Sequence, residues 1–407
     1  MNYCAIISEF NPLTNGHKYI INKAKEKTKL DVLCLMSGNF VQRGEIAILN
    51  KYERATSAIK SGASIVLELP IVYALSSAEI FASGAIKILK GIKNITHLAF
   101  GIETDNTLLL EKLAKTKVDN AKIIQDEIKK QTKTGLSYNK IVVSILKELL
   151  PENKQEIDNI FTGSNNILAI EYLTAIYKEK ANLTPVYIKR TDNGHNSNKI
   201  TKNVVDGKKT YFASASYIRE LSNEENFKKL KKLTDNNTFN ILSNKSKLYY
   251  KDKETRLNTL ILNELRKQDI NSLSTYYDYS QSLAGLINKL SNEKTNINDL
   301  VLSASGKSFR PSRIKKLLLY PLLSITKENF NNIFNNKQIV NVLAVAENKK
   351  QELTNLKSTS YTNLIVSVKD YNNLENKTSL ELNQLSSDIY NLVSCNTTSK
   401  DQTIFIK

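Results

Sequence analysis

The first hundred residues alternate between short, continuously apolar runs and longer segments in which apolar residues recur at helical spacing. The apolar runs predict buried strands, at Tyr3–Phe10, Asp31–Ser37, Ser64–Leu69 and Thr96–Ile102. The segments between them predict amphipathic helices with charged faces, at Gly16–Lys27, Lys51–Ser61 and Ser76–Lys90. Strands and helices that alternate at this spacing indicate βαβ units. The sequence therefore predicts an α/β fold with a Rossmann-like, doubly wound parallel sheet.

Polar segments follow each of the four predicted strands. They are Phe10–His17, Ser37–Glu45, Pro70 and Gly101–Asp105. In an open parallel sheet, ligands bind in the crevice at the carboxyl ends of the strands. We therefore expect these segments to face one crevice.

The pattern changes after residue 103. Residues 104–160 have the charged, periodic texture of a helical insertion, and Asn166–Lys178 predicts a further helix before a strand at Leu183–Lys189. A further helix is expected to open at Ser214, after Tyr211–Ala213.

From about residue 222 the chain is rich in Lys and Asn and loses its strand alternation. A short αβ piece is indicated near the end, with strands at Ile339–Val345 and Leu364–Val368. We expect two domains, an α/β domain at 1–222 and a mainly helical, basic region at 223–407.

Charge adds a candidate class of partner. The 407 residues include 58 Lys and Arg against 40 Asp and Glu, a formal net charge of +18. Such an excess favours polyanionic partners such as nucleic acid or anionic lipid. A solvated surface in a Lys- and Asn-rich proteome would give the same balance. Hydrophobic residues make up 41% of the chain, which argues against global disorder.

The cysteines and the N-terminus bear on the compartment. Cys4, Cys34 and Cys395 form no CxxC pair, so neither a thiolate zinc site nor a disulfide framework is indicated. The N-terminal residues lack the basic and long apolar segments of a signal peptide. No apolar stretch approaches the roughly 18 residues of a membrane span. We expect a soluble, cytoplasmic protein.

The stretch from Glu9 to His17 carries the strongest chemical signal. It leaves a buried strand, turns at Asn11-Pro12 and enters a helix at Gly16-His17. A helix N-terminus offers unpaired N–H groups and partial positive charge, which suit a phosphate, and a histidine there can donate to a phosphoryl oxygen. The alternative is an ordinary strand-to-helix turn capped by Asn15. No GxxxxGK[ST] loop and no GxGxxG follows this strand, so P-loop and dinucleotide-binding classes lose support.

The same stretch resembles the H-x-G-H nucleotidyltransferase superfamily and, more closely, the tRNA(Met) cytidine acetate ligase family. The resemblance is strong over roughly the first 220 residues and weak beyond them. Its further blocks are Ser37–Glu45, Leu67–Pro70, Phe100–Glu103, Ser164–Ala169, Arg190 and Ser214–Arg219.

The resemblance implies a reaction, its substrates and its site. Members of that family use ATP and acetate to form acetyl-adenylate, and then acetylate N4 of the wobble cytidine of elongator tRNA(Met). His17 and Thr14 would be the catalytic positions, with His17 steadying charge on the α-phosphate and Arg219 a candidate for the outer phosphates. The implied ATP-binding residues are Ile7, Ser8, Glu9, Phe10, Asn11, Pro12, Leu13, Thr14, Asn15, Gly16, His17, Lys18, Tyr19, Ile20, Gly101, Asn165, Arg190, Ser216 and Arg219.

The chain departs from the family pattern at Thr14, where relatives usually carry the first His of H-x-G-H. A threonine hydroxyl can donate a hydrogen bond but cannot hold a positive charge. Losing one charge-assisted contact costs on the order of 1–3 kcal/mol, or roughly ten- to hundredfold in rate. A slower first step, compensation by Lys18 or Arg219, or a decayed site are the open alternatives.

Four other polar residues have weaker assignments. Arg43 could touch substrate phosphate or tRNA, and Glu103 could orient substrate or form an ion pair. His97 lies in an apolar strand and is better explained as a core histidine, while His195 lies on a polar loop where it could contact substrate. Three scattered histidines predict no protein-bound metal, so Mg²⁺ would arrive with the ATP phosphates.

The densest basic cluster with an aromatic residue inside it is Lys307–Lys316. Such a run can pair with tRNA phosphates while Phe309 packs or stacks on a base. Its RNA-binding candidates, together with Arg43, are Lys307, Arg310, Arg313, Lys315 and Lys316. The alternative is an amphipathic helix with a solvated basic face. Lys51, Arg54, Lys229, Lys231 and Lys232 could extend the basic track.

Two rival functions remain open. One is a nucleotidyltransferase that acts on a small phosphate substrate, although the long basic C-terminal half has no role in it. The other is a non-catalytic RNA-binding relative in which Thr14 marks a decayed site. ATP binding by residues 1–220 would distinguish the non-catalytic relative from both kinds of enzyme. Acetate-dependent pyrophosphate release would distinguish the acetate ligase from the nucleotidyltransferase.

Overall fold

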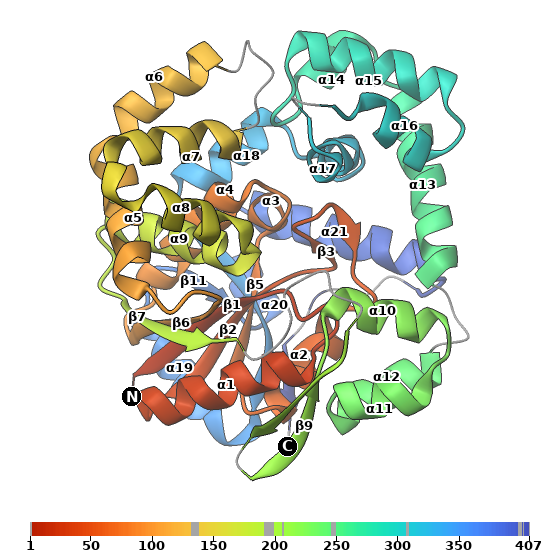
Figure 1. Ribbon diagram of the computed structural model, residues 1–407. Coiled ribbons are helices and arrows are strands. Elements are labelled where there is room, and N and C mark those ends of the chain that lie inside the picture. The colour runs from red at the N-terminus through yellow and green to blue at the C-terminus, as the bar shows by residue number, and fades with distance from the viewer. Residues whose placement is uncertain are drawn as a thin grey trace.

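The computed structural model describes residues 2–131, 138–190, 199–205, 207–245, 250–306, 309–397, 401 and 403–406. A mostly parallel sheet with helices on both faces forms its centre (Figure 1). This arrangement confirms the predicted α/β fold with a Rossmann-like sheet.

The strand order of the sheet is β11-β10-β5-β2-β1-β6-β7, with β12 paired to β10. The five strands β5, β2, β1, β6 and β7 are parallel to one another. After β1, the chain adds β2 and β5 on one side of it and then β6 and β7 on the other side. The strand order therefore reverses between β1 and β6. Open parallel sheets bind their ligands at such a reversal. The strands are β1 (Tyr3–Ser8), β2 (Asp31–Ser37), β5 (Ile65–Leu69), β6 (Ile95–Ile102), β7 (Thr184–Lys189), β10 (Ile339–Ala346), β11 (Asn363–Ile365) and β12 (Ile404–Ile406).

The predicted strands agree with the observed ones to within a few residues. β1 ends at Ser8, two residues early, because Phe10 takes a positive φ of 45° that extended backbone does not adopt. β11 ends at Ile365, and Val368 already belongs to the short helix α20 (Val368–Asn372). The prediction of a strand at Leu364–Val368 was therefore wrong in its second half.

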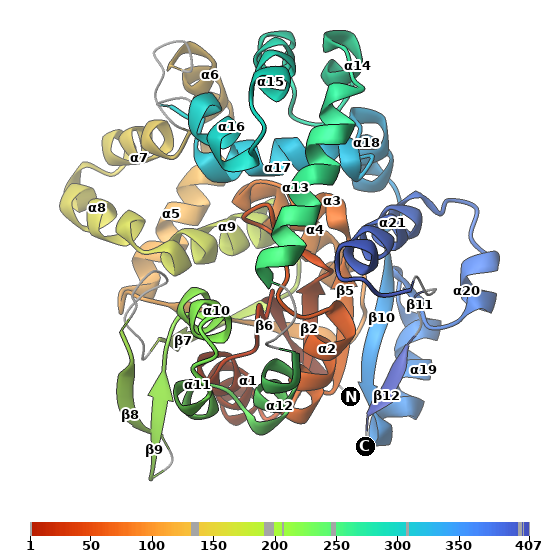
Figure 2. The ribbon, with the colours of Figure 1, turned by 90° about the vertical axis from the view of Figure 1, so that its right-hand side faces the viewer.

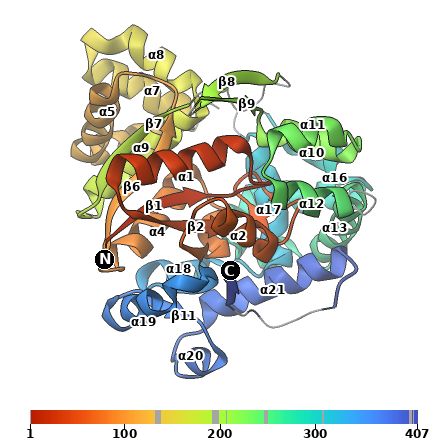
Figure 3. The ribbon, with the colours of Figure 1, turned by 90° about the horizontal axis from the view of Figure 1, so that it is seen from below.

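Alternate residues of each strand pack against helices on opposite faces of the sheet. On one face, Cys4 and Ile6 pack with residues of α1 (Asn15–Thr28) and α2 (Lys51–Lys60). On the other, Tyr3 and Ala5 belong to the larger core that includes α4 (Ala78–Lys90) and α9 (Ser164–Lys178). Seen from below, α1 runs along its face of the strands (Figure 3). The sheet is thus buried on both sides, as its apolar runs require.

The remaining elements surround this centre. After β6 come α5 (Thr107–Asp119), α6 (Ala121–Gln131), α7 (Tyr138–Leu149), η2 (Pro151–Asn153) and α8 (Lys154–Thr162). The hairpin of β8 (Thr201–Val205) and β9 (Lys208–Phe212) leads to α10 (Ala215–Asn223), α11 (Phe227–Leu233) and α12 (Asn236–Lys245). The shorter elements near the site are β3 (Phe40–Val41), β4 (Glu45–Ile46) and α3 (Ile71–Ala74).

The C-terminal part begins with a helical group and returns to the sheet. α13 rises from beside the sheet to this group (Figure 2). The helical group consists of α13 (Tyr250–Arg266), α14 (Ile270–Ser274), α15 (Gln281–Glu293), α16 (Ile297–Ala304), α17 (Pro311–Leu322) and α18 (Lys327–Asn335). The last elements are η3 (Glu347–Lys349), α19 (Lys350–Thr359), α20 and α21 (Thr378–Val393), which accompany β10, β11 and β12.

The C-terminal strands extend the N-terminal sheet instead of forming a separate piece. β10 pairs antiparallel with β5, with Val342 opposite Leu67, and it carries β11 and β12 on its other side. Residues beyond 338 therefore share a core with the first hundred residues. A division of the chain into domains at 222/223 stays a prediction.

Candidate active site

The site begins where β1 turns into α1. Phe10 has a φ of 45°, and the Asn11–Pro12 peptide bond is cis. Thr14 is the N-cap of α1, with extended backbone (φ −116°) and a hydroxyl that accepts a hydrogen bond from the backbone N–H of His17. The turn thus aims the N-terminus of α1, with its partial positive charge, at the carboxyl ends of the strands.

His17 is oriented by the same turn. Its Nδ1 accepts a hydrogen bond from the backbone N–H of Thr14 at 3.1 Å, and its ring packs edge-on against Phe10 with 5.2 Å between centroids. A neutral imidazole with an accepting Nδ1 carries its proton on Nε2. His17 therefore holds the tautomer that can donate a hydrogen bond from Nε2.

A cavity of about 290 Å³ lies at this end of the sheet. It is close to the lower end of the roughly 300–1,000 Å³ typical of small-molecule sites. Its walls come from β1 and the turn after it, α1, the loop after β2, α4, β6, α9 and α10. The cavity spans the point between β1 and β6 where the strand order reverses.

Most of the predicted ATP-binding residues line this cavity. The exceptions are Pro12, Leu13, Asn15 and Lys18. Pro12 and Leu13 are buried, and Lys18 is exposed on the outer side of α1. The side chain of Asn15 donates to the backbone oxygens of Tyr211 and Lys232, at 2.9 and 2.8 Å. Pro12, Leu13 and Asn15 thus belong to the buried or tied-down part of the turn. The lining residues are Ile7, Ser8, Glu9, Phe10, Asn11, Thr14, Gly16, His17, Tyr19, Ile20, Gly101, Asn165, Arg190, Ser216 and Arg219.

Across the cavity from His17, Asn165 and Arg190 form a second polar wall. Nη1 of Arg190 donates to Oδ1 of Asn165 at 2.9 Å. Oε1 of Glu103 accepts from the backbone N–H of Asn165 at 3.2 Å and from its side-chain amide. Gly101 lies beneath this pair, where an added Cβ would come within 3.2 Å of Cγ of Arg190. Glu103 thus orients Asn165 at the start of α9.

Arg219 closes the cavity on the side of α10. Its Nη1 donates to the backbone oxygen of Asn11 at 2.8 Å, and its Nη2 lies 3.4 Å from Oε2 of Glu45. Ser214 caps α10 by accepting from the backbone N–H of Tyr217 at 3.2 Å. Cationic Arg219 and the N-terminus of α10 therefore face the same cavity as His17, which favours a polyanionic ligand there.

The loop after β2 forms the third wall, and Glu9 ties it to the turn. Oε1 of Glu9 accepts from the backbone N–H of Gln42 at 2.6 Å. Burial raises the pKa of Glu9, partly offset by that hydrogen bond and by nearby arginines. Gln42, Arg43 and Glu45 of this loop line the cavity.

Arg54 fixes the base of this loop, a function that the sequence pattern did not predict. It is fully buried and donates to the backbone oxygens of Glu9 (2.6 Å), Ser37 (3.1 Å), Leu49 (3.0 Å) and Gly38. Burial lowers the pKa of Arg54 to about 10. Lys51, also on α2, is equally buried. The suggestion that Lys51 and Arg54 extend an RNA-binding surface was therefore wrong.

The basic cluster before and within α17 is only partly a surface feature. Arg310 is exposed, whereas Lys316 is buried and donates to the backbone oxygen of Ser76 at 2.9 Å. Lys316 is thus not available for a phosphate in this conformation. Lys307 lies outside the described residues, and Phe309 packs half-buried with the guanidinium of Arg313 5.1 Å from its ring centre.

Arg313 and Lys315 each already have an acidic partner. Arg313 forms two hydrogen bonds of 2.8 Å with the carboxylate of Asp278. Nζ of Lys315 lies 3.5 Å from Oε1 of Glu45. Glu45 therefore stands between Lys315 on α17 and Arg219, and it links α17 to the cavity wall.

Of the two remaining histidines, His97 does not line the cavity. His97 lies in β6, where its Nδ1 is 2.8 Å from Oγ1 of Thr96, and His195 lies outside the described part of the chain. Among the residues that are described, no three His, Cys, Asp or Glu side chains gather to hold a metal ion. None of the described helices is long and apolar enough to cross a membrane.

The fold and the cavity together define a class of protein. A doubly wound sheet with a Gly-His helix N-terminus at its switch point is the arrangement of a nucleotidyltransferase of the H-x-G-H type. The chain belongs to the HIGH Nucleotidyl Transferase family, whose sequence profile matches residues 1–403.

Two curated relatives carry the same name. A protein from Thermoanaerobacter sp. (strain X514), named tRNA(Met) cytidine acetate ligase, is 34% identical over 394 residues, which cover 96% of this chain and 95% of that protein. A protein of the same name from Clostridium acetobutylicum is 33% identical over 384 residues, covering 91% and 92%. The resemblance to this family is therefore confirmed.

Solved structures agree with the fold. The crystal structure of Thermotoga maritima TmcAL bound with alpha-thio ATP has a TM-score of 0.86, is 22% identical and covers 100% of both chains. The apo form of that protein gives a TM-score of 0.87 at the same identity and coverage. At this identity the likeness establishes the shared fold.

Proposed function

We propose that the protein is an ATP-dependent tRNA(Met) cytidine acetate ligase. It activates acetate as acetyl-adenylate and transfers the acetyl group to N4 of the wobble cytidine of elongator tRNA(Met). The observation that carries the proposal is the convergence of His17, Arg190 and Arg219 on one cavity at the N-terminus of α1. The names of the full-length relatives support it, as does the structural neighbour bound with alpha-thio ATP.

In the first step, a carboxylate oxygen of acetate attacks the α-phosphorus of ATP. The bond from that phosphorus to the bridging oxygen breaks, and pyrophosphate leaves with the electron pair. The N–H on Nε2 of His17 donates to a non-bridging oxygen of the α-phosphate, where negative charge grows in the transition state. Arg219 and the N-terminus of α1 stabilise the remaining phosphates, and Mg²⁺ arriving with ATP would supply further charge neutralisation.

In the second step, the N4 amine of cytidine attacks the carbonyl carbon of the mixed anhydride. AMP leaves with the electron pair of the broken C–O bond, and the amine loses one proton. The target base must be unstacked to reach the cavity, and the bases of an anticodon loop meet that need.

The tRNA approaches across α17 and the loop after β2. These elements touch closely, since Gly44 has a φ of 75° and an added Cβ there would lie 2.8 Å from the backbone nitrogen of Lys316. Arg43 on the loop and Arg310 at the start of α17 are exposed. In this proposal residues 1–222 bind ATP, residues 223–407 contribute most of the tRNA contacts, and both meet at this junction.

Incorporation of radiolabelled acetate into a tRNA(Met) transcript tests the proposal. We expect ATP-dependent labelling that nuclease digestion recovers as N4-acetylcytidine, and no labelling of a transcript with uridine at the wobble position. Labelling that does not need ATP, or equal labelling of both transcripts, would contradict it. A nucleotidyltransferase for a small phosphate substrate would leave both transcripts unlabelled.

A further inference from the structure

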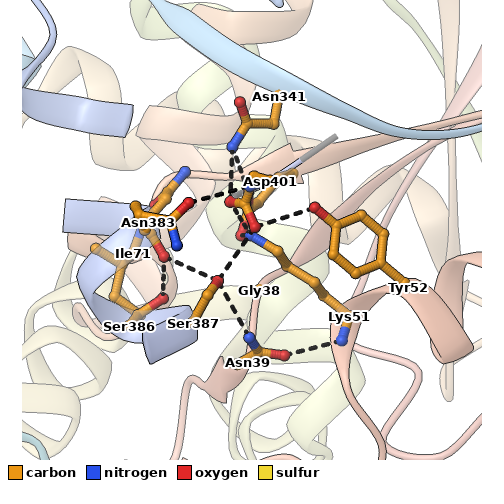
Figure 4. Close-up of polar contacts among 12 residues, drawn as sticks. Gly38, Asn39, Lys51, Tyr52, Ile71, Asn341, Asn383, Ser386, Ser387 and Asp401 are labelled. Carbon is orange, nitrogen blue, oxygen red and sulfur yellow. Dashed lines mark hydrogen bonds and ion pairs between the residues drawn. The ribbon is translucent and has the colours of Figure 1, made fainter. Parts of the chain in front are cut away.

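A buried cluster of charges links α2, β5 and the segment before β12 (Figure 4). Nζ of Lys51 lies 2.9 and 3.0 Å from the two carboxylate oxygens of Glu68 on β5. The same Nζ contacts Oδ2 of Asp401, which the chain brings in just before β12. The side chains of Lys51 and Glu68 are each 1% exposed, and that of Asp401 is 12% exposed.

Asp401 makes several contacts besides that with Lys51. Its Oδ1 accepts from the hydroxyl of Tyr52 at 3.0 Å, and its backbone N–H donates to the side chain of Gln384 at 3.0 Å. The amide of Asn341 on β10 donates to Glu68 at 2.8 Å and to Asp401 at 3.3 Å. Asp401 thus joins α2, β10 and α21, which lie far apart in the sequence.

The cluster places two carboxylates on one buried cation. Lys51 and Arg54 lie three residues apart on α2 and are both fully buried. Arg54 donates to backbone oxygens and interacts electrostatically with the carboxylate of Glu9, whereas Lys51 contacts both Glu68 and Asp401. Buried charges that lack a counter-charge are costly. The shared contact with Lys51 therefore holds Asp401 against α2 and β5.

The cluster is attached to the loop that forms the third wall of the cavity. Oδ1 of Asn39 accepts from the backbone N–H of Lys51 at 2.8 Å, and its Nδ2 lies 3.3 Å from Oγ of Ser387, which lies 3.4 Å from Oδ1 of Asp401. Gly38 lies directly against Glu68, where an added Cβ would come within 2.5 Å of Oε1. Both ends of residues 38–50 are therefore held by the cluster and by α2.

We propose that Asp401 is a positioning residue: its carboxylate completes the Lys51–Glu68 cluster and thereby fixes the loop at residues 38–50. The loop in turn sets the positions of Gln42 and Arg43 in the cavity wall, where Glu9 ties it to the turn that orients His17. The activity readout of this proposal rests on the function proposed above, whereas the loop readout does not.

Asp401→Asn is the sharpest variant, because it keeps the shape and the Oδ1 acceptor but removes the charge. Thr403→Val is its matched control. Oγ1 of Thr403 fastens the same segment to the backbone oxygen of Val342 at 2.7 Å, in a contact that involves none of the charged side chains of the cluster. Asp401→Glu, which restores a carboxylate, is the conservative variant.

Hydrogen exchange of the full-length protein, read by mass spectrometry, tests the loop directly. In Asp401→Asn we expect exchange at residues 38–50 to rise roughly tenfold, as a locally opened segment would. Exchange in β6 should stay unchanged. We expect the KM for ATP in pyrophosphate exchange to rise about fivefold with kcat nearly constant, because uniform binding is lost while His17 keeps its geometry. Asp401→Glu should restore part of both.

Unchanged exchange at 38–50 in Asp401→Asn, or an equal rise in Thr403→Val, would overturn the proposal. Should Asp401→Asn not fold, Ser387→Ala takes its place, since it cuts the link between Asn39 and Asp401. A rise at 38–50 in that variant supports the proposal, and no rise overturns it. If the wild type shows no pyrophosphate exchange, the proposed function fails while the hydrogen-exchange comparison still decides the role of Asp401.

Discussion

The backbone N–H of Thr14 donates to Nδ1 of His17 at 3.1 Å, and the hydroxyl of Thr14 accepts from the backbone N–H of His17 at 3.3 Å. This reciprocal pair is a capping box that uses a histidine at the third helical position. It stabilises the start of α1 and, through the same bond, selects the tautomer of His17 that donates from Nε2. Structure and chemistry therefore depend on different nitrogens of one ring.

Two substitutions of His17 separate those roles. Asn carries an acceptor near the place of Nδ1 but has no donor at that of Nε2, so His17→Asn should keep the cap and lose activity. We expect the rate of ATP–pyrophosphate exchange to fall roughly 100- to 1,000-fold, the range for loss of one transition-state donor. Its free energy of unfolding, from urea titration, should stay within about 0.5 kcal/mol of the wild type.

His17→Lys is the converse control, since its ammonium group can donate to a phosphoryl oxygen near the position of Nε2 but has no acceptor for the Thr14 N–H. It should retain more exchange activity than His17→Asn and lose about 1 kcal/mol of stability. Equal activity in the two variants would contradict the assignment of the donor to Nε2.

Thr14 is buried and caps α1 with its hydroxyl. Thr14→Val should lower the free energy of unfolding by about 1 kcal/mol, because an isosteric methyl group cannot accept the hydrogen bond from His17. Thr14→Ser, which keeps the hydroxyl, is the control and should remain near the wild type. Urea unfolding measures both, and a Thr14→Val variant as stable as Thr14→Ser would contradict the capping role.

Lys316 predicts a pH-dependent stability. Burial lowers the pKa of Lys316 to about 8, so between that pH and its ordinary value the unfolded chain binds more protons than the folded one. Stability from this group therefore rises with pH across that window. Lys316→Met removes the titration, and Gln42 still donates to the oxygen of Ser76 at 3.3 Å.

The measurement is the difference in unfolding free energy between Lys316→Met and the wild type at about pH 7 and about pH 9. The advantage of the variant should shrink by roughly 1 kcal/mol at the higher pH, because the buried amine of the wild type has by then lost its proton. If the stability difference between Lys316→Met and the wild type is the same at both pH values, the pKa of Lys316 is not lowered. If the difference is larger at the higher pH, the pKa is shifted in the opposite direction.

The exposed cations at the junction of α17 and the loop predict a salt dependence of tRNA binding. Arg310→Ala and Arg43→Ala should each weaken binding and reduce the slope of log K against log salt by about 1 if each contacts one phosphate. Lys93→Ala, an exposed lysine just before β6 and thus at the opposite end of the strands, is the control. Filter binding over a salt series measures the slopes, and equal slopes in all three variants would contradict this docking face.

Local sequence patterns were enough to predict the strands of the parallel sheet and most of the residues that line the cavity. The strand before Phe10 and the helix after Gly16 follow from periodicity and turn chemistry, and parallel βαβ units bring their ends together with Gly101. The hairpin of β8 and β9 was missed although the Asp206-Gly207 dipeptide is a strong hairpin signal. Gly207 has the positive φ of 74° that such a turn uses.

The features that the sequence did not predict depend on contacts between segments that are far apart in the chain. The pairing of β10 with β5 and the arrival of Asp401 beside Lys51 depend on residues more than 250 positions apart, which no periodicity reports. One local signal for the burial of Lys51 existed. It shares its helix face with Ala55 and Ile59, at i+4 and i+8, so it lies on the apolar stripe of α2.

The central claim is that this cavity adenylates acetate, and ATP–pyrophosphate exchange tests it most directly. The purified full-length protein would be incubated with ATP and labelled pyrophosphate, with and without acetate, beside His17→Asn. We predict exchange that requires acetate and falls at least roughly 100-fold in the variant. Exchange that proceeds equally without acetate, or no exchange while ATP still binds, would contradict carboxylate activation at this site.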